Sequence, residues 1–246
     1  METPQLLVVM PALNEERSIG HVVTTLANHG YTTCVVDDGS TDDTRNVAAD
    51  AGAKVLRLPV NLGVGGALRC GFRYARDNGY DMVVQCDADG QHRPDHIPLL
   101  LAQMEATGCD MVVGSRFAGA GSYELGASRR FAMNILGRVV GRSRGGKLSD
   151  VTSGFRAIRQ PLLDFFADEY PVEYLGDTVE ALVDARRAGF SVTETAVEMS
   201  HRETGSPSAS SVASTWYVAR VLGAILLQEG RSAPQPTSPN RDAKDL

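Results

Sequence analysis

The chain has 246 residues, of which 43% are hydrophobic and 22% are charged. This length suits one α/β domain of ordinary size or two small ones, and the composition excludes a chain that is mainly disordered or fibrous. The net charge of −6 gives no reason to expect nucleic acid as a partner, because proteins that track phosphates usually carry a basic excess.

The cysteines and the N-terminus indicate a cytoplasmic protein. None of the four cysteines has CxxC spacing, and Cys34 and Cys86 lie in apolar runs typical of buried strands. We therefore expect free thiols in a reducing compartment, and neither a disulfide framework nor a zinc site. The first five residues, METPQ, lack the basic segment of a secretory signal.

The first half of the chain alternates strand and helix patterns. Strands are expected at 6–10, 33–36, 54–58, 82–86 and 111–114, and helices at 17–28, 41–51, 66–78 and 98–107. Ser40 or Thr41 is placed to cap the second of these helices. This order predicts an α/β fold with a Rossmann-like, mostly parallel central sheet, right-handed crossovers and helices on both faces.

After Arg116 the pattern loosens. We expect a loop at 119–128, helices at 131–141, 179–188 and 212–227, a strand at 191–197, and a disordered tail at 230–246. The 212–227 segment contains Arg220 and is too short and too charged to span a bilayer comfortably. It either packs on the domain or lies at a membrane interface, with Trp216 and Tyr217 at headgroup level.

The strongest chemical signal is Asp87-Ala88-Asp89, directly after the strand expected at 82–86. Two carboxylates one residue apart at a strand end can both face a hard divalent cation. Such a cation can hold a nucleoside diphosphate and neutralise the charge that builds on a leaving group. A solvated turn is the alternative interpretation. Gln91 and His92 add an oxygen and a nitrogen ligand nearby. His92 and His96 could suggest zinc, but a zinc site is not expected here, because the neighbouring ligands are carboxylates and none is a cysteine.

Two further polar motifs follow predicted strands. Asp37 and Asp38 can accept hydrogen bonds from a base or a ribose hydroxyl, although an ordinary helix cap is the alternative. The segment PALNE, residues 11–15, ends the first strand. Ligands of parallel sheets bind at the carboxyl ends of the strands, so three motifs at three strand ends point to a binding site more strongly than one.

The segments PALNE, DDGSTDDT, NLGVGGALRCGF, DADGQH, GSR and DVTSGFRA occur in the order and spacing of the family-two inverting glycosyltransferases of the GT-A fold. Within that family the chain most resembles the dolichyl-phosphate mannosyltransferases and the bacterial polyprenyl-phosphate sugar transferases, from about residue 6 to residue 208. The resemblance implies one GT-A domain over residues 1–229, with a nucleotide-binding half at about 5–116 and an acceptor-binding half at about 117–229.

The resemblance also implies an activity. A sugar would pass from a nucleotide-diphosphate sugar, GDP-mannose or a UDP-sugar, to polyprenyl phosphate at the cytoplasmic face of the membrane. Asp87, Asp89 and Gln91 would coordinate Mg²⁺ or Mn²⁺ on the diphosphate, and Asp89 would count among the catalytic groups. The nucleoside would be held by Pro11, Asn14, Glu15, Asp37 and Asp38.

The glycine-rich turn and several arginines complete the implied site. Gly65, in NLGVGGA, can approach a sugar or phosphate closely, or can serve only a tight strand-to-helix turn. Val64 stands where the family often has lysine. The arginines able to clamp phosphate oxygens in a bidentate way are Arg116, Arg129 or Arg130, and Arg156. The alternative for each is an arginine at the surface or in an ion pair within the protein, and for Arg156 a structural pair is a strong alternative.

By resemblance, Arg116 and the pair at 129 and 130 lie near the acceptor phosphate, with Arg116 counted as catalytic. Arg202 and Ser206 belong to a loop that closes over the diphosphate, and Ser208 replaces a lysine common in the family. We expect peripheral membrane association, through 212–227 or through a small membrane-protein partner.

Asp177 bears on the choice of acceptor. An acceptor phosphate is already ionised at neutral pH, whereas a hydroxyl acceptor needs a general base. Asp177 resembles that base in family members with hydroxyl acceptors, or it caps a helix beginning near Thr178. The alternatives to a polyprenyl-phosphate transferase are transfer to a glycan or small-molecule hydroxyl, and a non-catalytic nucleotide-sugar-binding subunit of a membrane complex.

Overall fold

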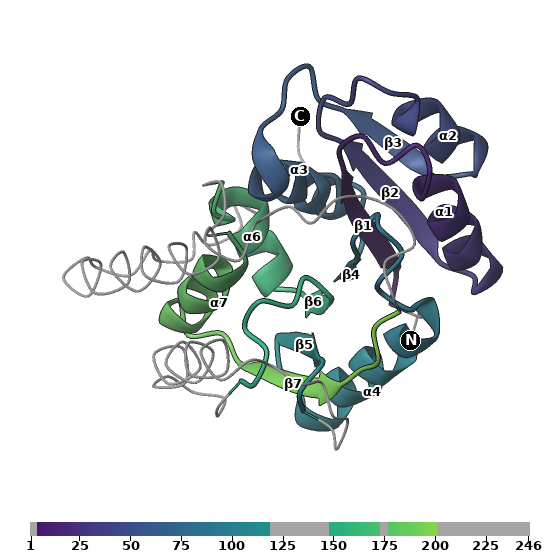
Figure 1. Cartoon of the computed structure of the whole chain (residues 1–246). Coiled ribbons are helices and arrows are strands. Elements are labelled where there is room, and N and C mark those ends of the chain that lie inside the picture. The colour runs from purple at the N-terminus through teal and green to yellow at the C-terminus, as the bar shows by residue number, and fades with distance from the viewer. Residues whose placement is uncertain (1–3, 119–147, 173–176, 201–246) are drawn as a thin grey trace, which may run out of the picture.

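The computed structural model describes residues 4–118, 148–172 and 177–200 (Figure 1). Several sequence predictions lie outside these residues: the loop at 119–128, the helices at 131–141 and 212–227, and the tail at 230–246.

A single sheet organises the described residues. Its strands are β1 (Leu6–Ala12), β2 (Thr32–Asp37), β3 (Lys54–Arg57), β4 (Met82–Gln85), β5 (Met111–Ser115), β6 (Arg156–Arg159) and β7 (Val192–Ala196). They lie in the order β3-β2-β1-β4-β6-β5-β7. β3, β2, β1 and β4 run parallel, as do β5 and β7, and β6 runs antiparallel to both of its neighbours. The expected mostly parallel sheet is confirmed.

Helices cover both faces of this sheet (Figure 1). They are α1 (Ile19–Asn28), α2 (Thr44–Asp50), α3 (Gly63–Asp77), the short 3₁₀ helix η1 (Pro94–His96), α4 (Ile97–Thr107), α6 (Leu162–Glu169) and α7 (Asp177–Arg187). One apolar layer joins the sheet to α3, α6 and α7, and the other joins it to α1, α2 and α4. β1 is buried on both faces, with Val9 in the first layer and Val8 in the second, which explains its continuous apolar run.

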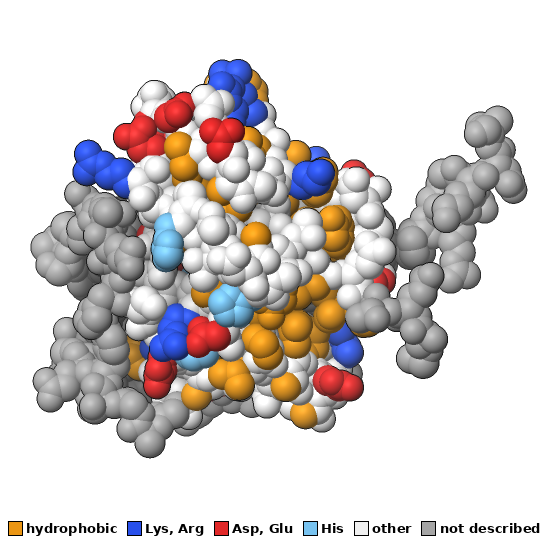
Figure 2. Space-filling view, turned by 90° about the vertical axis from the view of Figure 1, so that its right-hand side faces the viewer, with side chains coloured by type: hydrophobic (Ala, Val, Ile, Leu, Met, Phe, Trp, Pro, Cys, Tyr) orange, Lys and Arg blue, Asp and Glu red, His pale blue; other side chains and the backbone are white. Residues whose placement is uncertain are grey.

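The outer surface of the second layer is mixed. On the face shown in Figure 2, hydrophobic side chains gather in the lower part of the view, over α4, and charged side chains surround them. Leu99 of α4 is exposed. The four cysteines are free thiols, as expected, and burial raises the pKa of Cys34 to about 12.

Two features differ from the sequence predictions. β6 and α6 were not expected. The β6 sequence, RAIR, carries only two apolar residues and begins with a buried arginine. The predicted cap of the second helix was wrong: α2 begins at Thr44, three residues after Thr41. Ser40 and Thr41 instead hydrogen-bond to Asn14 at the end of β1.

Asp184 of α7 should make the stability depend on pH. Burial, together with Glu180 and Glu169, raises the pKa of this carboxyl from 3.8 to about 6. A raised carboxyl pKa means that the folded state keeps a proton that the unfolded chain loses, so stability falls as the pH rises from about 4 to about 6. We expect Asp184→Asn to raise the free energy of unfolding by about 2 kcal/mol at neutral pH. Urea unfolding at about pH 4 and about pH 7.5 measures this, and an equal change at both pH values would contradict it.

Candidate functional site

The carboxyl ends of β2, β1 and β4 bring the polar motifs to one edge of the sheet. These strands are neighbours, with Ala12 opposite Asp37 and Val9 opposite Gln85. Each strand leads directly into its motif: β1 into PALNE, β2 into Asp37-Asp38 and β4 into DADGQH. Pro11 lies within β1 and is partly exposed. The parallel topology therefore gathers in space what the sequence separates.

The loops after β1 and β2 interlock. Asn14 has a φ of +55°, a left-handed conformation that asparagine tolerates better than most residues. Its N–H donates to Ser40 Oγ at 3.0 Å, and its side-chain oxygen accepts from the N–H of Thr41 at 2.8 Å. The N–H of Glu15 donates to Thr44 Oγ1 at 2.7 Å, while its carboxylate accepts from Ser18 Oγ at 2.7 Å. Asn14 and Glu15 thus fasten the two loops together.

Asp37 and Asp38 are buried and bind backbone N–H groups. Asp37 accepts from the N–H of Ser40 at 2.9 Å, and Asp38 accepts from the N–H of Leu62 at 2.7 Å. Burial raises the pKa of Asp38, although the N–H groups of Leu62 and Gly63 act in the opposite direction. Asp38 therefore anchors the glycine-rich turn before α3. Gly65 of that turn is itself buried in the first turn of the helix.

The two carboxylates of DADGQH are placed differently. The side chain of Asp87 is 42% exposed, whereas Asp89 as a residue is 8% exposed and its carboxylate accepts from the N–H of Gln91 at 3.0 Å. Asp87 also donates its backbone N–H to Nδ1 of His92 at 2.9 Å. The carbonyl of Gln91 accepts from the N–H of Ser200 at 3.0 Å, which joins this loop to the chain after β7.

These carboxylates suit a hard divalent cation that takes further ligands from elsewhere. Among the described residues, no group of three or more His, Cys, Asp or Glu side chains is placed to hold a metal ion. Two carboxylates two positions apart in one loop nevertheless supply the type of oxygen ligand that Mg²⁺ and Mn²⁺ prefer, and phosphate oxygens and water could complete the shell. The imidazole of His92 is buried, with Nδ1 occupied by the backbone of Asp87, and so supports that residue.

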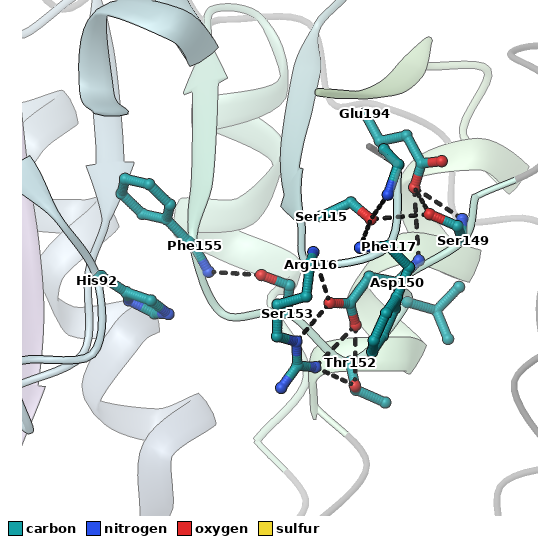
Figure 3. A network of polar contacts seen from close by, with 12 residues as sticks. His92, Ser115, Arg116, Phe117, Ser149, Asp150, Thr152, Ser153, Phe155 and Glu194 are labelled. Carbon is teal, nitrogen blue, oxygen red and sulfur yellow. Dashed lines mark hydrogen bonds and ion pairs between the residues drawn. The ribbon is translucent and has the colours of Figure 1, made fainter. Parts of the chain in front are cut away.

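Arg116 forms a bidentate ion pair with Asp150 (Figure 3). Its Nε donates to one carboxylate oxygen at 2.7 Å and its Nη2 to the other at 2.9 Å. Nη2 also donates to Thr152 Oγ1 at 3.1 Å. The side chain of Arg116 is 24% exposed and that of Asp150 is fully buried. Of the two interpretations of Arg116, the pair within the protein is the one that the structure shows.

Glu194 of β7 holds the same loop from the other side (Figure 3). Its carboxylate accepts from the N–H of Ser149 at 2.7 Å and from the Oγ of Ser149 at 3.0 Å. Ser115 Oγ, at the end of β5, lies 2.7 Å from Ser149 Oγ. Residues 148–155, which we call the β6 approach loop, are thereby tied to both β5 and β7. The roles of Asp150 and Glu194 were not predicted, because the sequence around each does not indicate which residue it will contact.

Arg156 is fully buried and donates to backbone carbonyls. Its Nε donates to the carbonyl of Ser153 at 2.9 Å and its Nη2 to that of Thr178 at 2.7 Å. Arg156 is thus held by the protein's own backbone. Thr178 lies in the first turn of α7, of which Asp177 is the first residue.

The remaining predicted site residues lie outside the described part of the chain: Arg129, Arg130, Arg202 and Ser206. Of Asp177 the structure describes the backbone position only. No helix within residues 4–118, 148–172 and 177–200 is long and apolar enough to cross a membrane.

The sheet order and the helices on both faces are those of the GT-A fold. A solved structure of glucosyl-3-phosphoglycerate synthase from Mycobacterium tuberculosis, in complex with Mn²⁺, UDP and glucosyl-3-phosphoglycerate, superposes with a TM-score of 0.65. The match covers 96% of this chain and 82% of that one, at 23% sequence identity. The GT-A fold expected from the sequence is confirmed.

The chain belongs to glycosyl transferase family 2, whose model matches residues 7–166. It is 32% identical over 211 residues to an undecaprenyl-phosphate mannosyltransferase from Micrococcus luteus, covering 82% of this chain and 86% of that one. It is 30% identical over 214 residues to a polyprenol monophosphomannose synthase from Mycolicibacterium smegmatis, with coverage of 82% and 80%. A UDP-N-acetylglucosamine–dolichyl-phosphate N-acetylglucosaminyltransferase from Methanococcus voltae is 28% identical over 217 residues, with coverage of 80% and 86%.

Proposed function

We propose that this chain transfers a sugar, with inversion, from a nucleotide-diphosphate sugar to polyprenyl phosphate at the cytoplasmic face of the membrane. The observation that carries the proposal is the Asp87 side chain at the end of β4, which is 42% exposed and lies two positions before the buried Asp89. The relatives named for transfer to undecaprenyl phosphate, polyprenol and dolichyl phosphate support a lipid-phosphate acceptor. GDP-mannose and UDP-sugars are both candidate donors.

Asp87 and Asp89, with Gln91, are the residues that would hold Mg²⁺ or Mn²⁺. A bound cation would supply charge neutralisation of the diphosphate leaving group. Asp89 is held by the N–H of Gln91, so its carboxylate needs little reorganisation when charge develops nearby. Pro11, Asn14, Glu15, Asp37 and Asp38 would line the nucleoside side, where their hydrogen bonds already set the loops.

The acceptor question depends on Asp177. A phosphate acceptor attacks the anomeric carbon as an anion and requires no general base, whereas a hydroxyl must lose a proton. Arg156 holds the carbonyl of Thr178 at 2.7 Å and so places the start of α7, where Asp177 stands. This placement keeps open a second function, transfer to a glycan or small-molecule hydroxyl with Asp177 as the base.

Asp177→Asn separates the two functions. Asparagine has nearly the same shape as aspartate, so the variant removes the charge from the first residue of α7 and changes little else. We expect transfer to polyprenyl phosphate to stay within about threefold of wild type, whereas loss of a general base would lower the rate by about 10²- to 10⁴-fold. The assay follows diphosphate release from GDP-mannose, UDP-glucose and UDP-N-acetylglucosamine with Mn²⁺, with and without each acceptor.

Two results would overturn the proposal. One is the absence of transfer from any donor to polyprenyl phosphate, and the other is transfer to hydroxyl acceptors alone. Thermal stabilisation by one donor in the presence of Mn²⁺ identifies the nucleotide. Sedimentation with liposomes tests peripheral association, and binding that appears only with a small membrane-protein partner would assign the contact to that partner.

A further inference from the structure

Gly154 of the β6 approach loop lies directly against the carboxylate of Asp87. A Cβ added at Gly154 would stand 3.1 Å from Oδ1 and 3.2 Å from Oδ2 of Asp87. The same Cβ would lie 3.4 Å from the amide nitrogen of Gln85, a buried residue whose Oε1 has no hydrogen-bond partner. Both distances to the carboxylate are shorter than the contacts that Cβ atoms usually make, so a side chain at position 154 would require the carboxylate to shift by a few tenths of an ångström. The carboxylate is therefore packed closely against the backbone at position 154.

Backbone conformation does not explain why glycine occupies position 154. Gly39, Gly63 and Gly90 of the neighbouring loops have φ values between +77° and +80°, which disfavour other residues. Gly154 is not among the described glycines with positive φ, so alanine can adopt its backbone conformation without strain. What the position requires is room.

His92 supports Asp87 from a second side. Nδ1 accepts the N–H of Asp87 at 2.9 Å, so the neutral ring carries its proton on Nε2. Nε2 faces Asp87 Oδ2 at 3.6 Å, which is too long for a hydrogen bond, and the ring therefore acts mainly by holding the backbone of Asp87. The buried imidazole stacks on Phe155, with ring centroids 4.9 Å apart and an angle of 18° between the planes.

The approach loop is too firmly held to yield to an added side chain. Asp150 binds Arg116, the backbone of Ser149 binds Glu194, and the carbonyl of Phe155 accepts from the N–H of Gly114 at 2.8 Å. Figure 3 shows Phe155 beside His92 and the Arg116–Asp150 pair further along the same loop. A contact at position 154 would therefore be relieved by the part that can rotate, the carboxylate of Asp87.

We infer that Gly154 and His92 are positioning residues that set the carboxylate of Asp87 in its place before a cation binds. This inference rests on the proposed function, in which Asp87 is a cation ligand. Residues that orient metal ligands typically change metal affinity by about 10- to 100-fold when they are replaced, because a displaced ligand must be re-ordered on binding.

The test is a titration of the protein with Mn²⁺ alone, in which electron paramagnetic resonance measures the concentration of the free ion. Gly154→Ala should weaken binding by about tenfold or more while the melting temperature changes by less than about 3 °C. His92→Phe, which retains an aromatic ring for stacking and lacks the Nδ1 acceptor, should also weaken binding. The matched control is Gly20→Ala on α1, whose added Cβ would lie 2.9 Å from Cγ1 of Val47 in α2. It should leave Mn²⁺ affinity unchanged.

A double variant shows whether the effect passes through Asp87. In an Asp87→Asn background, Gly154→Ala should cause no further loss of Mn²⁺ affinity, because the ligand it displaces is already gone. An equal further loss in that background would overturn the inference, as would wild-type affinity in Gly154→Ala. If wild type and Asp87→Asn bind Mn²⁺ equally, the cation site of the proposed function fails instead, so the two failures are distinguishable.

Discussion

Replacing Asp87 with asparagine is expected to lower the rate of sugar transfer by about a thousandfold, with either Mg²⁺ or Mn²⁺ present. The amide keeps the shape of the side chain and removes its negative charge. Among the described residues, the carboxylate accepts no hydrogen bond, and the nearest ring nitrogen is Nε2 of His92 at 3.6 Å. The native fold therefore has little need of the charge, and we expect the loss to fall on the reaction.

The measurement is kcat for diphosphate release, together with the melting temperature. Asp89→Asn should reduce the rate to a similar extent, with a larger effect on stability because Asp89 is buried and accepts the N–H of Gln91. Asp95→Asn is the matched control, since this exposed carboxylate of η1 pairs with Arg93 at the surface. Near wild-type turnover in Asp87→Asn would show that this carboxylate plays no part in transfer.

Asp150→Ala is expected to lower the free energy of unfolding by about 3 kcal/mol, the largest stability effect that we predict. The fully buried carboxylate holds the guanidinium of Arg116 at two points and also accepts from Thr152 Oγ1 at 3.1 Å. Removing it deprives a partly buried cation of this two-point ion pair. Activity should fall as well, because the approach loop carries Gly154 to Asp87.

Urea denaturation measures this loss. Asp168→Ala provides the matched control: this aspartate also pairs with arginines, Arg73 and Arg76, but its side chain is 47% exposed. Such a surface pair contributes about 1 kcal/mol or less. Arg116→Ala/Asp150→Ala should regain part of the stability, since both members of this ion pair are then removed together. If Asp150→Ala and Asp168→Ala lowered the free energy of unfolding equally, burial of the Arg116–Asp150 pair would add nothing to stability.

The nucleotide-binding half of the fold follows from local sequence patterns. β1 and β2 are buried on both faces, so unbroken apolar runs identified them, and α3 alternates with them at the expected position. β6 was missed because a strand of four residues with arginine at both ends has no such run. Arg156 is accommodated there by carbonyls from outside the strand, Ser153 and Thr178, which no local pattern reveals.

The candidate site was predictable only in part, for a similar reason. The topology of a parallel sheet brings the ends of neighbouring strands together, so the motifs after β1, β2 and β4 could be placed at one edge from the sequence. The partner of Arg116 could not be predicted, because Asp150 lies 34 positions away and the pair forms only when the sheet is complete. The proposed roles of Arg129, Arg130, Arg202 and Ser206 stay predictions.

The direction of β6 has a consequence for how this kind of sheet can surround a ligand. In a wholly parallel sheet, only segments that leave a strand reach the carboxyl edge, while segments that enter a strand lie on the opposite side. Because β6 is reversed, with Arg156 opposite Gln85, its entering segment arrives at the same edge as the segments leaving β4 and β5. One inverted strand thus brings a loop from a later part of the chain to the carboxyl edge. Substitutions in that loop can change the surroundings of the site without altering the strands that lead into its carboxylates.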